Sequence, residues 1–237
     1  MLFFFKASPN REAFFYKIYI LKMFTFKSDC KKIFQKAYEN RYTWPDNFNG
    51  YKGNFILKED KNKFKGDFII GKNFQPQIKN TDDKEVVNKI SSQLFEVVIH
   101  RVKKSFEETH LQNQFNFLGQ SEKGIEMEVS GKNNGDKYRV KDGNINMVFR
   151  KIHGIIIQIF VEDFFDTGNG VLSRKYSSQQ LDVISLQPKT QKYKYLDNFI
   201  KIKNTDLWAL ESRTINYKNE YEEDSISKYF FKDIEKM

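Results

Sequence analysis

Three histidines, His100, His110 and His153, are the side chains of this sequence best suited to acid–base or metal chemistry. They show none of the HxxxH or HExxH spacings of zinc sites, and the single cysteine, Cys30, is distant from all of them in the sequence. A zinc site would therefore need the fold to gather all three rings. Glu96 lies one helical turn before His100, which favours an i,i+4 pair at the edge of a core. We expect no metal site, and an inert thiol at Cys30.

Acidic residues leave one catalytic alternative open. A carboxylate–imidazole pair would form if a histidine met Glu107, Glu108 or Asp166 in a cleft. The usual motifs of acyl transfer, nucleotide hydrolysis and dinucleotide binding are missing from the sequence. Its nearest glycine-rich element, Gly168-Asn169-Gly170, is interpreted as a hairpin turn in preference to a calcium loop. We expect no catalytic residue and no cofactor, and an enzyme ranks behind a binding protein.

A second group of residues combines positive charge, imidazole and aromatic rings near the ends of the expected elements. Its members are Arg41, Tyr42, Trp44, His100, Arg101, Arg150 and His153. If the fold brings them together, they would bind an amphipathic ligand with an anionic head, or an acidic partner surface. In the structural alternative, Tyr42 and Trp44 plug the open end of a sheet and the arginines pair with glutamates. The ligand site requires Arg41 or Arg150 to be without a carboxylate partner.

Composition restricts the class of protein. The chain of 237 residues has 40 Lys+Arg against 31 Asp+Glu, a net charge of +9, and is 39% hydrophobic. These values are typical of a folded chain and exclude a disordered one. Most of the positive charge is lysine interleaved with acidic residues, so we expect no nucleic-acid partner. The sequence contains no run of about 18 apolar residues, so it predicts no transmembrane helix. We expect a cytoplasmic protein, and peripheral association with a membrane stays open.

Apolar periodicity predicts the elements that must position these residues. A helix begins at Ser28 or Asp29 and ends by Thr43, and strands follow at 51–58 and 64–70, each with an aromatic-Lys-Gly sequence that predicts a bulge or bend. A second helix is expected over 82–104, capped by Asp82 with Glu85. Further strands are expected near 114–118, 124–130, 137–141, 145–152, 155–161, 171–176, 192–202 and 206–217.

These elements predict an α+β fold with a single curved antiparallel sheet, a half-barrel-like meander. The long helix is expected to pack on its concave face, beside an N-terminal helix. We assign residues 1–27 to a loosely docked extension, 28–218 to one domain, and 219–237 to a tail with a short helix near 226–234. The aromatic start has two interpretations, a frayed end or an interfacial anchor, and Met23 is an alternative start to Met1.

Several short segments together resemble a known family. They are 37–44 (AYENRYTW), 99–102 (IHRV), 105–107 (SFE), 135–138 (GDKY), 150–154 (RKIHG) and 166–170 (DTGNG). In this order they resemble the uncharacterised family of cyanobacteria and plastid-bearing eukaryotes known as domain of unknown function 3386. The resemblance implies a soluble cytoplasmic or stromal protein of phototrophs and assigns no activity, ligand or catalytic residue.

Two classes of function remain. The expected architecture resembles, as a fold analogy only, the lipoprotein-carrier fold that shelters acyl chains. The first class is therefore a non-enzymatic carrier of an apolar or amphipathic small molecule, a lipid or pigment. The second is an interaction or assembly factor for a photosynthetic or membrane complex, with residues 41–44 and the turn at 150–154 as its exposed patch.

Overall fold

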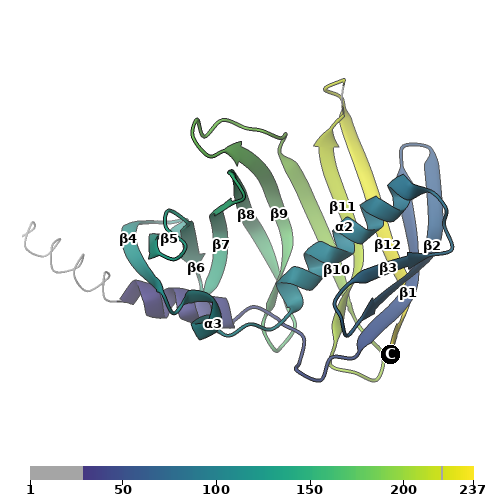
Figure 1. The fold of residues 1–237 in the computed structure, drawn as a ribbon, viewed down its shortest axis with the longest axis horizontal. Coiled ribbons are helices and arrows are strands. Elements are labelled where there is room, and N and C mark those ends of the chain that lie inside the picture. Colours follow the sequence, from purple (N-terminus) through teal and green to yellow (C-terminus); the bar gives the residue numbers. More distant parts are fainter. Residues whose placement is uncertain (1–28, 220) are drawn as a thin grey trace, which may run out of the picture.

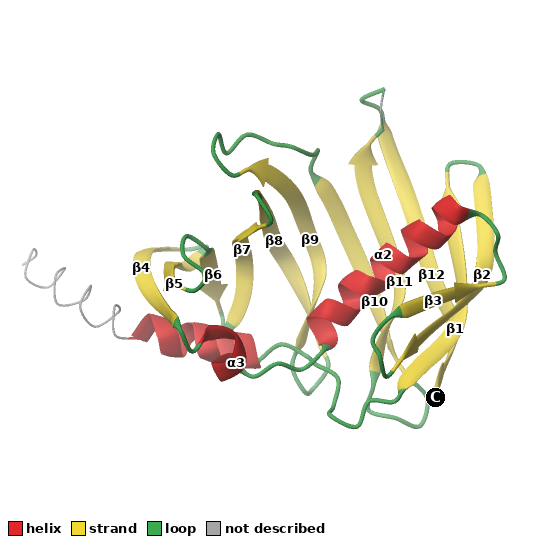
Figure 2. Ribbon diagram, in the orientation of Figure 1, coloured by secondary structure: helices red, strands yellow, loops and turns green. Residues whose placement is uncertain are grey.

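The computed structural model describes residues 29–219 and 221–237 and is dominated by one sheet (Figures 1 and 2). The helices are a segment over residues 29–39, α2 (Lys84–Arg101) and α3 (Phe106–His110). The strands are β1 (Gly50–Glu59), β2 (Asn62–Gly71), β3 (Pro76–Lys79), β4 (Asn113–Ser121), β5 (Gly124–Gly131), β6 (Lys137–Lys141), β7 (Asn144–Ile152), β8 (Ile155–Asp166), β9 (Val171–Asp182), β10 (Tyr193–Lys201), β11 (Trp208–Lys218) and β12 (Asp224–Lys236). The expected extension over residues 1–27 lies outside the described residues.

All twelve strands belong to a single antiparallel sheet, so this part of the predicted fold is confirmed. Its order is β3-β2-β1-β12-β11-β10-β9-β8-β7-β6-β5-β4. The meander from β4 to β12 follows the chain, and the hairpin of β1 and β2 joins its far end through β12.

The C-terminal segment is a strand in the middle of this sheet, and the short helix expected near 226–234 is wrong. Ser227, Tyr229 and Phe231 are buried, whereas Lys228 and Lys232 between and after them are exposed. This period of two matches a strand with one buried face. The segment pairs with β1 on one side and β11 on the other, which satisfies the backbone groups of both neighbours.

The two glycines of the first hairpin are sites of close approach, and neither supplies the extra residue of a bulge. The pairing of β1 with β12 shifts register between Lys52 and Asn54, and the extra residue is in β12, opposite Gly53, whereas β1 and β2 pair without a shift. A Cβ atom at Gly53 would lie 2.6 Å from Lys232 O, so this glycine lets the bulged backbone of β12 approach. Gly66 has a different role, because a Cβ atom there would lie 2.6 Å from the ring of Phe55. The missing side chain lets that ring pack against the backbone of β2.

Two separate hydrophobic cores lie on the same face of the sheet, which we call the inner face. The first core combines buried residues of α2 with those of β1, β2, β11 and β12, and it includes Ile90, Leu94 and Phe231. The second combines the helix over 29–39 and α3 with β4, β5 and β6, around Phe34. Figures 1 and 2 show α2 crossing the sheet in front of β10 to β12, with α3 close to the opposite end.

Local capping sets the helix ends. Asp83, and not the expected Asp82, caps α2: its carboxylate accepts hydrogen bonds from the backbone N–H groups of Glu85 and Val86. The short helix α3 was not predicted, although Ser105 and Glu108 form a complete capping box. That spacing was the available signal in the sequence.

A buried ion pair ties α2 to the sheet. The guanidinium of Arg213 in β11 donates two hydrogen bonds to Asp197 in β10, of 2.8 and 2.7 Å, and both residues are buried. Its remaining donor reaches Gln93 at 2.9 Å and Glu96 at 2.8 Å, both on α2. Glu96 pairs with Arg213 and forms no hydrogen bond or ion pair with His100 among the described residues, so the expected pairing of Glu96 with His100 is wrong.

Candidate functional site

A strip of four aliphatic side chains crosses the inner face between the two cores. Ile155, Ile157, Ile159 and Val161 of β8 are each partly exposed, and none of them belongs to either core. Strand register places them on the inner face, through the pairings Tyr138–Val148, Val148–Ile159, Val161–Tyr176, Tyr176–Tyr195 and Tyr195–Ile215. We call these four residues the central strip.

Two tyrosines border the central strip on the side of the first core. The rings of Tyr176 in β9 and Tyr195 in β10 stack with centroids 4.6 Å apart and planes 3° apart. Arg213 lies 5.5 Å from the centroid of Tyr195 and 6.0 Å from that of Tyr176. Burial raises the pKa of both phenols, so both are uncharged donors at neutral pH.

Arg41 reaches this region because the chain after the first helix is joined to the start of β9. Tyr42 N donates to Val171 O at 3.0 Å, and Val171 N donates to Asn40 O at 2.8 Å. Gly170 permits this approach, because a Cβ atom there would lie 2.9 Å from Asn40 O and its φ is +117°. The Gly168–Gly170 segment is thus a turn, which agrees with its interpretation from the sequence.

The guanidinium of Arg41 lies flat on an aromatic ring and has no carboxylate partner among the described residues. Its carbon is 3.7 Å from the centroid of the Tyr38 ring, and its Nε donates to Tyr38 O at 2.8 Å. Its terminal nitrogens donate no hydrogen bond to any other residue that the structure describes. A fixed guanidinium with free donors is suited to binding an anion.

The other two arginines of the predicted set differ from each other. Arg150 in β7 lies 3.4 Å from the buried carboxylate of Asp136, so it is paired. Arg101, at the end of α2, has no ion pair within the part of the chain that the structure describes and lies 5.8 Å from the ring of Phe199. Burial lowers the pKa of Arg101 to about 10, which leaves it charged at neutral pH.

His100 lies among these arginines. The residue has exposed surface, and desolvation by the surrounding protein, followed by the charges of Arg101, Arg41 and others, lowers its pKa to about 3. The imidazole is therefore neutral at physiological pH.

The structure places the remaining members of the predicted set elsewhere. Tyr42 and Trp44 are only 3% and 2% exposed, in the first core, where Trp44 stacks on Phe48 at 4.1 Å. They cannot form the exposed patch expected for a protein partner, so that interpretation is wrong. His153 and Gly154 have φ values of +48° and +78° and form the exposed turn between β7 and β8.

His110 and Cys30 are structural residues of the second core. His110 is 4% exposed, and its Nδ1 lies 3.0 Å from the side-chain nitrogen of Asn113. Burial lowers the pKa of His110 to about 4 and raises the pKa of the Cys30 thiol. An uncharged thiol with no exposed surface is inert, as expected. No group of three or more potential metal ligands occurs in the described residues.

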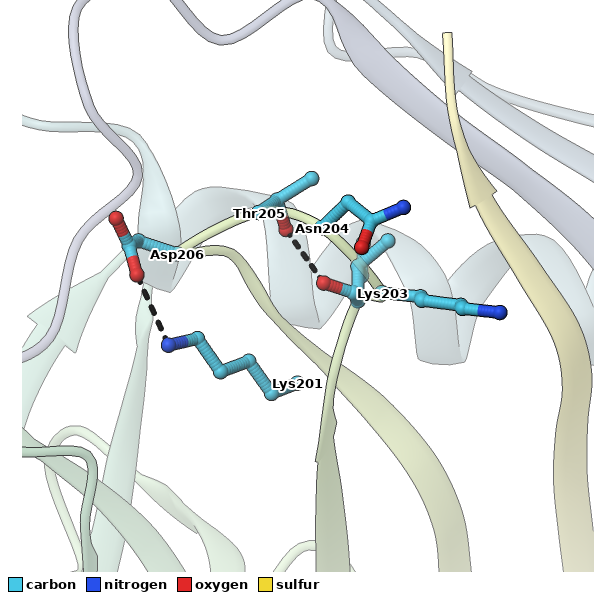
Figure 3. Close-up of a pocket in the computed structure, with 6 residues that line it drawn as sticks. Lys201, Lys203, Asn204, Thr205 and Asp206 are labelled. Atoms are coloured by element: carbon cyan, nitrogen blue, oxygen red, sulfur yellow. Dashed lines mark hydrogen bonds and ion pairs between the residues drawn. The ribbon is translucent and has the colours of Figure 1, made fainter.

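Figure 3 shows a different depression, at the turn between β10 and β11, lined by residues 201–206. Lys201 and Asp206 form an ion pair there at 2.9 Å, and the Thr205 hydroxyl donates to Ile202 O at 2.8 Å. These polar groups satisfy one another on an exposed turn. The central strip and its arginines are the stronger candidate site.

The low pKa of His110 predicts acid sensitivity. Below pH 6.5 the unfolded chain binds a proton at this histidine, whereas the folded chain does not until about pH 4. The stabilising contribution is complete above pH 6.5, declines as the pH falls, and amounts to about 3 kcal/mol. Urea unfolding at pH 7, 6, 5 and 4.5 measures it. In the His110→Gln variant, the slope of the unfolding free energy against pH should be smaller by the equivalent of about one bound proton. Equal slopes in the variant and the wild type would contradict the prediction.

Comparisons with known proteins give a family and distant structural likenesses. A family model described as "Protein of unknown function (DUF3386)" matches residues 25–237. No curated protein matches the chain. A LolA superfamily protein from Nitrosomonas europaea is 9% identical, with a TM-score of 0.29 over 88% of this chain and 93% of its own. A DUF1329 family protein from Desulfovibrio piger is 8% identical, with a TM-score of 0.26 over 90% and 92%. No described helix has the length and apolar character needed to cross a bilayer.

Proposed function

Since the chain belongs to the DUF3386 family, as its sequence motifs indicated, and the description of that family names no activity, we propose a function from the site itself. The protein is a non-enzymatic carrier that binds an amphipathic molecule with an apolar chain and an anionic head. The apolar chain lies along the central strip, and the head binds at Arg41. The observation that carries this proposal is a row of partly exposed aliphatic side chains on the inner face, together with an arginine, joined to the start of the neighbouring strand β9, that has no carboxylate partner among the described residues.

The central strip has the length and chemistry for an acyl or isoprenoid chain. Ile155 and Val161 are separated by six residues of extended strand, or about 20 Å at the usual rise. Ligand sites for apolar molecules are lined mainly by aliphatic and aromatic side chains with a few polar groups at one end. Tyr176 and Tyr195 supply the aromatic border.

Charge around the strip supports an anionic head. Arg101, Arg41, Arg213 and Arg150 all act on the pKa of His100. Arg213 and Arg150 have carboxylate partners, whereas Arg41 and Arg101 have none among the described residues. Neutral His100 adds no further charge and leaves its ring nitrogens for hydrogen bonds. Nothing in this arrangement supplies a nucleophile or a general base near neutral pH, which favours binding over catalysis.

Titration with cis-parinaric acid, a fluorescent fatty acid, and with its methyl ester tests the proposal. The wild-type protein should bind the acid saturably, and Arg41→Gln should weaken this binding about tenfold, because a charge-assisted hydrogen bond is lost. Binding of the ester should be the same in both proteins. Ile157→Glu should weaken the acid and the ester alike, because it places a carboxylate in the strip.

Arg139→Gln is the matched control, because Arg139 is on the outer face of the same sheet and is already paired with Glu126 at 3.3 Å. It should bind both probes like the wild type. Failure of the wild-type protein to bind the acid saturably would refute the carrier function. Equal loss in the Arg41→Gln and Arg139→Gln proteins would refute the assigned head site. Native mass spectrometry of the purified protein should also reveal a co-purified amphiphile.

A further inference from the structure

We propose that the outer face of β2, β1 and β12 docks on an anionic lipid bilayer. This inference rests on the proposed carrier function for its choice of a bilayer, and on the register of three strands for its geometry. The outer face is the side of the sheet away from α2 and both cores. Five exposed lysines define the surface, and we call them the lysine array: Lys58, Lys63, Lys65, Lys228 and Lys232.

Strand register puts three of these lysines side by side. Lys58 in the middle strand is directly opposite Lys63 of β2 and directly opposite Lys228 of β12. Side chains opposite each other in an antiparallel pair have Cβ atoms about 5 Å apart, and like charges at such positions destabilise the sheet. Because this row of like charges does not stabilise the folded sheet, we infer that it binds an anion outside the protein.

The next rows continue the pattern and add apolar groups. Ile56 is opposite both Lys65 and Phe230, and Lys232 is opposite Asn54. Lys58 Nζ lies 5.4 Å from the ring centroid of Phe230. Lysines around a partly exposed aromatic ring match a bilayer surface, where phosphates meet the lysines and the ring reaches the interface.

The lysine array lacks internal neutralisation. No member forms an ion pair with any described residue, although eight other lysines of the chain do. Four acidic residues lie at or beside outer-face positions of these three strands. Asp67 accepts hydrogen bonds from Asn54 and Asn80, Glu235 is 3.9 Å from Lys52, and Asp224 pairs with Lys218 at 3.0 Å. Asp233 lines a depression together with Lys65 and Lys232. The row of Lys63, Lys58 and Lys228 has no carboxylate opposite it in these strands, so the positive charge is concentrated there.

Co-sedimentation with phospholipid vesicles tests the inference. The full chain should bind vesicles of phosphatidylcholine with 30% phosphatidylglycerol in 0.1 M salt and should not bind pure phosphatidylcholine. The triple variant Lys58→Gln, Lys63→Gln, Lys228→Gln should lose about 100-fold in partitioning, because each lysine near an anionic surface contributes about fivefold. Removal of the opposed charges should leave the thermal midpoint unchanged or slightly higher.

The control is the triple variant Lys123→Gln, Lys132→Gln, Lys141→Gln, which removes the same charge from exposed positions in two turns and at the end of β6. It should keep most of the vesicle binding. Equal loss in both variants, or no binding to the anionic vesicles by the wild type, would overturn the inference. So would tighter binding of a mixed-sequence 20-mer oligonucleotide that depends on the same three lysines.

The outcomes separate this surface from the ligand site. The lysine-array variant should bind parinaric acid like the wild type, because Lys58, Lys63 and Lys228 are on the opposite face from Arg41 and the central strip. If no protein binds parinaric acid but vesicle binding needs the array, the carrier function fails and the docking surface stands.

Discussion

Replacement of Arg213 by methionine should destabilise the protein by about 3–5 kcal/mol, because it leaves the carboxylate of Asp197 buried without a counter-charge. Asp197 is 2% exposed and receives both of its charge-assisted hydrogen bonds from Arg213. The same substitution removes the contacts of Arg213 with Gln93 and Glu96, which hold α2 against the sheet. For a chain of this size, the thermal midpoint should fall by roughly 6–20 °C.

A double variant separates the buried charge from the lost packing. Arg213→Met with Asp197→Leu should recover most of the loss, since well-packed apolar residues can replace a buried ion pair at little cost. The exposed pair of Lys52 and Glu235 is the control, and Lys52→Met should change stability by less than about 1 kcal/mol. A loss below about 1 kcal/mol in the Arg213→Met protein would show that Asp197 is not held by Arg213 in solution.

Truncation of Phe34 to alanine should have a comparable effect in the second core, about 3–5 kcal/mol. Phe34 is 1% exposed, stacks on Phe115 at 4.5 Å, and also contacts Tyr138 and His110, with centroid distances of 4.5 and 5.1 Å. Because this core shares no residue with the first, the loss should be local. Native-state hydrogen exchange should show faster exchange in β4, β5 and β6, with little change in β1, β11 and β12.

The neighbouring Gln35→Ala variant is the control for this experiment, because that side chain makes an exposed hydrogen bond to Glu39 on the same helix. It should alter stability by no more than about 0.5 kcal/mol. An equal rise in exchange over the whole sheet after Phe34→Ala would show that the two cores unfold as one cooperative unit.

Local patterns were sufficient to predict most elements of the fold. Tyr51, Phe55 and Leu57 recur with a period of two and form the buried face of β1. Val86, Ile90 and Leu94 recur at helical intervals in α2. The last strand was missed because Ile226, Tyr229, Phe230 and Ile234 also fit helical spacing, and the unpaired edge of β1 that selects a strand is invisible in the sequence.

The site depended on contacts that no local pattern encodes. The sequence predicts Arg41 as a binding residue from its type alone, whereas its position follows from a bridge to Val171, which is distant in the chain. The alternating pattern of residues 155–161 was sufficient to predict a strand. It does not show that the inner-face residues of this strand belong to neither core. Trp44 was predicted to be exposed but is buried in the first core. An aromatic residue at the end of an element suits a core as well as an interface, so its type alone does not distinguish the two.

The position of β12 between β1 and β11 also governs the order in which the protein can be assembled during its synthesis. About 170 residues separate β1 from its partner β12, so roughly 8–34 s of translation pass between the two strands. The second core needs only residues 29–152 and can form in that interval, whereas the first core must wait for the final strand. Until then the free edges of β1 and β11 can pair with other chains, and a nascent chain stalled before residue 224 would keep both edges open.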